Sequence, residues 1–82
     1  MGQAIRISRH ARGRMKLYGI TVADVTATLE YPDTTENQGD ATALIKAFPG
    51  RYSGYPLKVV YERQGDALVV ITAYPLKKKA WR

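Results

Sequence analysis

The chain has 82 residues, enough for one small domain, 1–82, with a single hydrophobic core. It contains no cysteine and one histidine, which excludes disulfides and thiol nucleophiles and argues against a histidine-rich metal centre. No apolar run approaches the roughly 18 residues of a membrane span, the N-terminus lacks the apolar core of a signal peptide, and no glycine pattern matches a nucleotide-binding fingerprint. We therefore expect a soluble, cytoplasmic protein without membrane, metal or other cofactor.

The chain is basic, with 13 Lys and Arg against 7 Asp and Glu and a net charge of +6. Such a charge favours a polyanionic partner, either nucleic acid or an acidic protein, although many small proteins are basic for solubility alone. The positive charges concentrate in residues 6–16 and 77–82, and all 7 acids lie between these segments. The two ends of the chain should therefore carry the positive field.

The N-terminal part predicts a first helix. Residues 4–8 alternate between polar and apolar side chains, which suits a short strand or an extended lead-in. Ser8 can then cap the helix, and Gly19 can end it in the left-handed conformation. The apolar stripe of this helix is formed by Ala11, Met15 and Tyr18.

A second helix is predicted after Thr21, because this hydroxyl and the acid Asp24 have the spacing of a capping box. Pro32 disfavours helical geometry at Tyr31 and so ends the helix there. The joint of two or three residues should make the two helices spatial neighbours. The expected buried face consists of Val22, Val25 and Leu29.

Two hairpins are predicted in the remainder of the chain. Residues 34–38 and 41–48 flank a Gly-Asp turn. Residues 57–62 and 67–74 are rich in β-branched and aromatic side chains, and their near-continuous apolarity predicts central strands. The expected fold class is therefore α+β, with two N-terminal helices packed on an antiparallel sheet.

Two segments should lie outside the regular elements. Residues 49–56 hold two prolines and two glycines, which predicts an exposed, irregular loop. Residues 75–82 are short and charged, which predicts a basic C-terminal tail.

Spaced motifs occur in both halves of the chain. The first half contains His10-Ala11-x-x-Arg14-Met15, Gly19-Ile20-Thr21-x-x-Asp24-Val25 and Tyr31-Pro32-Asp33. The second contains Leu57-Lys58-Val59-Val60-Tyr61-Glu62 and Val69-Val70-Ile71-Thr72-Ala73-Tyr74-Pro75. In order and spacing these segments resemble an uncharacterised bacterial domain family that is grouped with RelE/ParE-like toxins. The resemblance implies two helices on a four-stranded antiparallel sheet, to which a short N-terminal strand could be added.

By superfamily analogy, the resemblance implies a toxin of a toxin-antitoxin pair that cleaves RNA, including ribosome-bound mRNA, and is neutralised by a cognate antitoxin protein. The alternative is a non-catalytic module of the same fold that binds nucleic acid or protein. A DNA-binding helix-turn-helix ranks last, because two helices leave no third helix to support a recognition helix. The oligomeric state stays open.

Metal-free RNA cleavage needs a base for the 2′-hydroxyl proton, cations for the phosphorane charge and a proton donor for the leaving 5′ oxygen. His10 is the candidate base, and Arg14, four residues on, is a candidate cation on the same helix face. Alternatively, His10 is an ordinary polar residue near a helix start, and Arg14 is solvated or pairs with Glu30 or Glu36.

Tyr74 and Lys58 complete the predicted catalytic set. Tyr74 ends the last strand, where it could donate a proton, stack on a base or simply close the core. Lys58 opens the preceding strand and could bring a second cation to the same end of the sheet, or form a solvated pair with Glu62.

Six further residues are predicted to bind RNA: Arg51, Tyr52, Tyr55, Lys77, Lys78 and Lys79. The loop members combine charge with aromatic faces, a composition used to hold unpaired bases, although such loops also occur without a ligand. The tail lysines could bind phosphate or serve solubility only.

Overall fold

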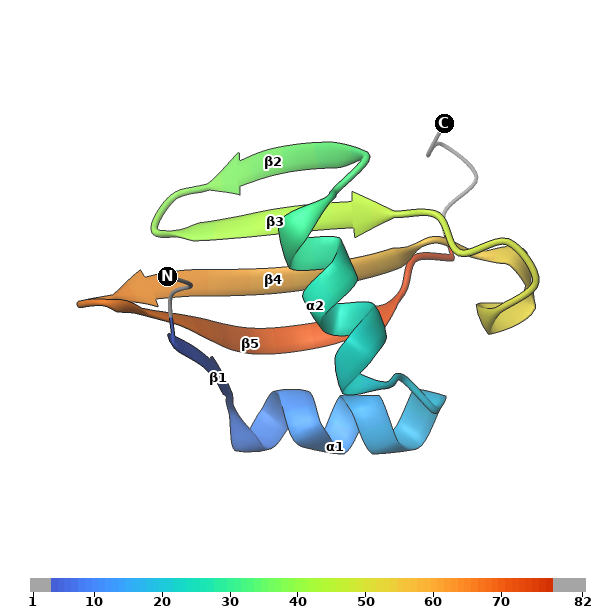
Figure 1. Ribbon diagram of the computed structural model, residues 1–82, viewed down its shortest axis with the longest axis horizontal. Helices are drawn as coiled ribbons and strands as arrows, with labels where there is room; N and C mark the ends of the chain where they lie inside the picture. Colours follow the sequence, from blue (N-terminus) through green and yellow to red (C-terminus); the bar gives the residue numbers. More distant parts are fainter. Residues whose placement is uncertain (1–3, 78–82) are drawn as a thin grey trace.

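The computed structural model describes residues 4–77 of the chain. This part contains two helices, five strands and one short 3₁₀ turn (Figure 1). The helices are α1 (Arg9–Tyr18) and α2 (Val22–Glu30). The strands are β1 (Ala4–Ile7), β2 (Thr34–Gln38), β3 (Ala41–Lys46), β4 (Leu57–Gln64) and β5 (Ala67–Pro75), and the 3₁₀ turn η1 covers Tyr52–Gly54.

The five strands form one sheet in the order β1-β5-β4-β3-β2. Neighbouring strands are antiparallel except β1, which pairs in parallel with β5. The predicted α+β class, with two helices on an antiparallel sheet, is therefore confirmed, and so is the central position of the second hairpin. The short N-terminal strand, one of the two alternatives for residues 4–8, is present as β1.

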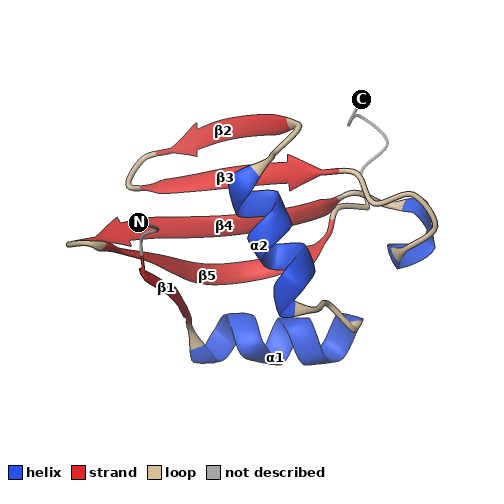
Figure 2. Cartoon of the chain, viewed as in Figure 1, coloured by secondary structure: helices blue, strands red, loops and turns tan. Residues whose placement is uncertain are grey.

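Both helices lie on one face of the sheet (Figure 2). Helix α1 packs against β5, and α2 crosses β4 and β3. The predicted helix ends are confirmed: the Ser8 Oγ accepts the Ala11 N–H at 3.1 Å, and Gly19 has a φ of 67°. The Thr21 Oγ1 likewise accepts the Asp24 N–H at 3.1 Å. These caps place the joint between the helices at Gly19 to Thr21.

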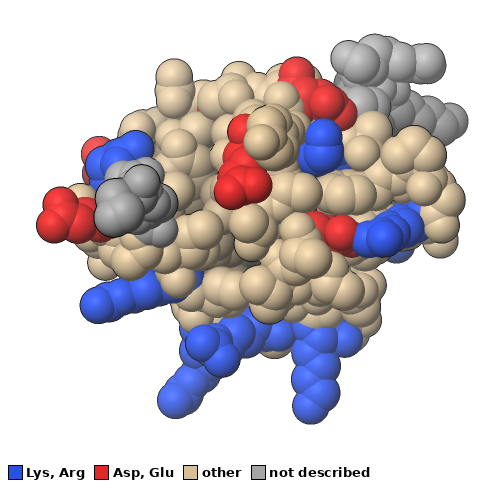
Figure 3. Space-filling model, in the orientation of Figure 1, with Lys and Arg blue, Asp and Glu red and all other residues tan. Residues whose placement is uncertain are grey.

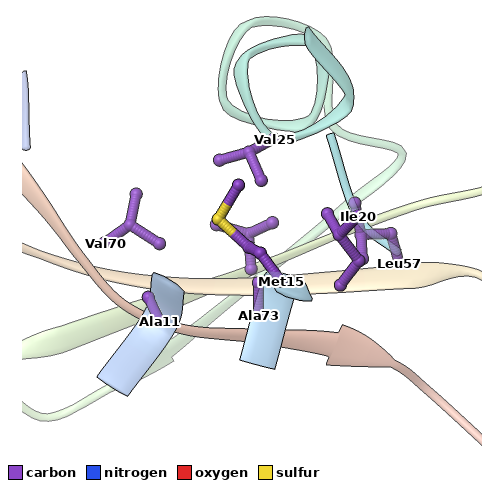
Figure 4. Packing of buried hydrophobic residues seen from close by; sticks show 8 residues of the cluster. Ala11, Met15, Ile20, Val25, Leu57, Val70 and Ala73 are labelled. Atoms are coloured by element: carbon purple, nitrogen blue, oxygen red, sulfur yellow. The ribbon is translucent and has the colours of Figure 1, made fainter. Parts of the chain in front are cut away.

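The core lies between the helices and the sheet (Figure 4). Met15 of α1 points under α2 toward Val25, above the side chains of β4 and β5. A cluster of apolar side chains closes this interface without a disulfide: Ala11, Met15, Ile20, Val25, Leu57, Val59, Val70 and Ala73. Burying a valine, leucine, isoleucine or methionine side chain contributes about 1.5–3 kcal/mol, and the two alanines contribute less.

The predicted buried face of α2 is partly wrong. Val25 is 1% exposed and Leu29 is half-buried, but Val22 is 59% exposed. The helix is rotated so that Asp24 and Thr28 lie inside. Residues on a helix are separated by about a third of a turn, so bringing Asp24 inward moves Val22 to the solvent side.

Two predictions about segments outside the regular elements also need correction. The segment 49–56 contains the 3₁₀ turn, and the strand before it, β3, ends at Lys46 two residues earlier than expected. Pro75 belongs to β5, and Leu76 is buried with its N–H donated to the Pro56 carbonyl at 2.7 Å. The start of the predicted tail therefore belongs to the folded domain, because it pairs with the chain entering β4.

Candidate functional site

The loop that precedes β4 is tied to the start of α2 by a buried carboxylate. Asp24 is 6% exposed, and both of its oxygens lie 2.6 Å from Nη1 of Arg51. The Tyr52 hydroxyl donates to Oδ2 of the same carboxylate at 2.5 Å. A buried carboxylate is costly unless cations and donors compensate it, and here both compensating groups come from the loop.

The backbone of this loop is unusual. Tyr52 and Ser53 have φ values of 53° and 56°, in the left-handed backbone region that residues other than glycine rarely adopt. Each such residue costs about 1–3 kcal/mol, so the surrounding contacts must impose the shape. For Tyr52 they are the hydrogen bond to Asp24 and an edge-to-face contact with the Phe48 ring at 5.9 Å between centroids.

Electrostatics keeps the carboxylate charged. Burial alone would raise the pKa of Asp24, but the hydrogen bonds from Tyr52 and Arg51 and the charge of Arg51 outweigh it and hold this pKa below 3.8. The pKa of Tyr52 is raised to about 12, first by burial of the Tyr52 side chain and then by its hydrogen bond to Asp24 and the negative charge of Asp24. The pKa of Arg51 is raised by the hydrogen bond that its guanidinium donates to Asp24 and by the negative charge of Asp24. At neutral pH an ionised acceptor thus faces two protonated donors.

An open pocket of about 510 Å³ lies beside this group of residues. It is formed where the end of α1, the joint, the first turn of α2 and the loop meet, and its lining consists of Tyr18, Gly19, Thr21, Asp24, Arg51, Tyr52 and Ser53. The Arg51 side chain remains 57% exposed although it pairs with Asp24. The pocket therefore combines aromatic rings, a cation, hydroxyls and a buried anion.

A basic surface adjoins the pocket along α1. The helix contains no acid, and its cationic side chains, Arg9, Arg12, Arg14 and Lys16, are all exposed. In Figure 3 Lys and Arg side chains gather along the edge formed by α1, whereas acidic and further basic side chains are mixed over the rest of the visible face. We call these four residues together with His10 the α1 basic surface.

The structure divides the predicted catalytic set. His10 and Arg14 are both exposed on α1, and within the described residues Arg14 forms no ion pair with Glu30 or Glu36. Lys58 and Tyr74 are register partners on β4 and β5, with the lysine Nζ 5.9 Å from the tyrosine ring centroid. Side chains alternate along a strand, and the adjacent Val59 and Ala73 face the helices. The pair therefore lies on the sheet face opposite α1.

The predicted RNA-binding residues also separate into groups. Arg51 and Tyr52 hold Asp24, while the Lys77 Nζ lies 5.8 Å from the Tyr55 ring centroid. Lys78 and Lys79 lie outside the described residues. The loop and the first tail lysine are thus brought together, but two of the loop side chains are engaged within the protein.

The sequence predicts only a capping role for Asp24, and Ser53, Thr21 and Tyr18 are not among the predicted site residues. One feature of the sequence could have indicated a further role for Asp24: an aspartate occupies the position where a glutamate commonly closes the capping box. Nothing in the spacing could indicate a partner 27 residues away. In residues 4–77, no three His, Asp or Glu side chains are grouped as metal ligands, and neither helix is long and apolar enough to cross a bilayer.

The sequence model of the family described as Domain of unknown function (DUF4258) matches residues 7–75. The chain belongs to the DUF4258 family. The DUF4258 match includes the whole segment from His10 to Pro75 that carries the motifs, and so takes in both helices and strands β2 to β5. Comparisons with curated proteins and with solved structures gave no match. Membership of the DUF4258 family by itself assigns no activity.

Proposed function

We propose that this DUF4258 domain is a cofactor-free RNA-binding module of the cytoplasm that grips the phosphate backbone with the α1 basic surface. The observation that carries the proposal is the exposure of four cationic side chains and one histidine on a helix without an acid. Cations placed along one exposed element are the footprint of phosphate binding. The helix spans roughly 15 Å, which is enough for contacts to a few successive phosphates.

The arrangement of these side chains supports backbone binding over base reading. Arg9, Arg12 and Lys16 recur at spacings of three and four, so they form one row along the helix. His10 and Arg14, four residues apart, form a second row on the other flank of the helix, and Gly13 and the exposed Leu17 lie between the two rows. The sheet side of α1 is occupied by Ala11 and Met15, so both rows are free of core contacts.

The proposal is tested by the affinity of the full chain for a fluorescently labelled single-stranded RNA. Reversing one charge, Arg9→Glu, should weaken binding about tenfold, roughly 1.4 kcal/mol. The matched control is Arg63→Glu, which makes the same change in net charge at an exposed position on β4. Equal affinities of the two variants would refute the role of α1, and DNA of the same sequence measures selectivity.

A second candidate is a ribonuclease toxin of the kind that the RelE/ParE resemblance implies. The observation favouring it is that His10, the only histidine in the chain, lies beside Arg14 within the α1 basic surface. His10 would take the 2′-hydroxyl proton, the 2′ oxygen would attack phosphorus, and the 5′ oxygen would leave with a proton from solvent. Arg14 would stabilise the charge on the phosphorane oxygens. Lys58 and Tyr74, on the opposite face of the sheet, would take no part in this step.

The ribonuclease candidate has its own test, in which growth and transcript ends are followed in a bacterial host that expresses wild type or His10→Ala. Growth arrest with new transcript ends for wild type alone supports the enzyme. Normal growth and intact transcripts for both leave the binding module. An antitoxin would in that scheme be an acidic protein that covers the α1 basic surface.

A further inference from the structure

We infer that the pocket at the C-terminal end of α1 binds one unpaired nucleobase of the RNA whose backbone lies along that helix. The inference rests on the proposed RNA binding. The cations of α1 contact phosphates and cannot recognise a base, and the pocket would bind that base. Tyr18, the last residue of α1, lines the pocket together with the capping Gly19. Tyr18 lies four residues after Arg14 and therefore on the same flank of the helix as Arg14 and His10. An RNA strand held by His10 and Arg14 therefore passes the pocket mouth.

The size of the pocket suits a planar group of this class. Its volume of about 510 Å³ lies within the range of roughly 300–1,000 Å³ that is typical of small-molecule sites. Three chain segments build the walls: the end of α1, the joint with the first turn of α2, and the loop. Because the pocket is widely open to solvent, a base can enter while its ribose and phosphates remain outside.

The lining has the chemistry of base recognition. The rings of Tyr18 and Tyr52 offer flat apolar faces, and base stacking on such rings is tolerant of sequence. The exposed guanidinium of Arg51 can donate to base oxygens and ring nitrogens, and the Ser53 hydroxyl can donate or accept. Every nucleobase presents both donors and acceptors at its edge.

The buried carboxylate of Asp24 decides against a phosphate in the same place. A charged acid in the lining repels a phosphate group at short range, and Arg51, its neutralising partner, is already paired with it at 2.6 Å. A neutral base suffers no such repulsion. The division of labour follows: phosphates bind on α1, and the base enters the pocket.

The pocket is also preorganised. Asp24 fixes Arg51 and Tyr52 in place, and Tyr52 and Ser53 are held in left-handed backbone conformations that this small domain maintains against their strain. A site whose walls are fixed before binding loses less conformational entropy when its ligand arrives. Ser53 is exposed at the pocket, so its strained backbone is not offset by burial of its own side chain.

The experiment compares two RNA oligomers of equal length and phosphate number, a normal hexamer and its abasic counterpart, binding to the full-length wild type. The normal hexamer should bind about tenfold tighter, because one stacked base contributes at that level. Equal affinity of the two oligomers overturns the base pocket and leaves backbone binding by α1 intact. Failure of both oligomers to bind overturns the base pocket and the proposed function together.

A matched pair of variants locates the base. Tyr18→Leu removes a ring that lines the pocket while keeping an apolar side chain against the core, and Tyr31→Leu makes the same change at a 71% exposed tyrosine outside the lining. The preference for the normal hexamer should fall to near one in Tyr18→Leu, with abasic binding unchanged, and persist in Tyr31→Leu. A preference that survives Tyr18→Leu places the base elsewhere. Where Tyr18→Leu fails to fold, the comparison of the two hexamers on the wild type still decides whether a base is bound, and equal affinity there overturns the pocket.

Discussion

The Asp24 carboxylate lies 2.6 Å from Nη1 of Arg51, across 27 residues of sequence and between two different elements. This pair, with the Tyr52 hydroxyl as a third member, joins the first turn of α2 to the loop before β4. It explains why α2 turns an acid inward, why the loop has a fixed shape, and how the pocket acquires its walls.

The hydrogen bond from Tyr52 to Asp24 should be visible in stability. Tyr52→Phe keeps the ring and its contact with Phe48 but removes one donor from a buried carboxylate, and should lower the free energy of unfolding by about 1–3 kcal/mol. Tyr31→Phe, at an exposed ring, should change it by less than about 0.5 kcal/mol. Urea unfolding measures both. Equal values would mean that the hydrogen bond from Tyr52 does not stabilise the loop.

Stability should fall in acid because of Asp24. Its pKa is lower in the folded protein than the value of 3.8 of a free carboxyl, so the unfolded chain takes up the proton first as the pH falls. The contribution is present above pH 3.8 and is lost as the pH falls through the folded value. Unfolding measured from pH 7 downward should show that Asp24→Asn removes this part of the acid sensitivity. An unchanged acid profile in Asp24→Asn would contradict the assignment.

Two glycines of the first helix should respond in opposite directions to alanine. Gly13 lies inside α1 with open space around it, so Gly13→Ala should stabilise the protein by about 0.5–1 kcal/mol. Gly19 also has open space, but its φ of 67° is left-handed, and Gly19→Ala should destabilise by about 1–2 kcal/mol. Thermal unfolding of the two variants checks the signs, and stabilisation by Gly19→Ala would contradict the described helix end.

Two valines of α2, one buried and one exposed, should differ in how much they contribute to the free energy of unfolding. Val25→Ala should cost about 2–3 kcal/mol, because it empties space between α2, Met15 and the sheet. Val22→Ala should cost less than about 0.5 kcal/mol, because the side chain is exposed and alanine has the higher helix propensity. Chemical denaturation of both variants measures the difference. Similar costs would mean that α2 is rotated differently on the sheet.

The salt dependence of RNA binding should count the phosphate contacts of α1. For a single strand, each contact contributes about 0.7 to the slope of log affinity against log salt. Lys16→Ala should therefore reduce the slope by roughly that amount, whereas Glu36→Gln on β2 should leave it unchanged. Affinity measured over a range of salt concentrations gives the slope. A slope that is insensitive to Lys16→Ala excludes that residue as a phosphate contact.

The local elements of this protein were determined by the sequence itself. Ser8, Gly19 and Thr21 specify the helix ends through their own side chains or backbone freedom, and these signals act within a few residues. The alternation and β-branched content of residues 57–74 likewise specified the central hairpin. The family motifs lie in these same segments, which is why the matched region could be anticipated.

Only the tertiary structure decided which side chains meet. The spacing of His10, Arg14, Lys58 and Tyr74 left open whether they share a face, and the strand register placed the last two on the far side of the sheet. The inward turn of Asp24 depends on a loop whose closing contacts lie 27 and 28 residues away. Sequence patterns report local preferences, whereas a pair of this kind forms only after packing fixes α2 and the loop together.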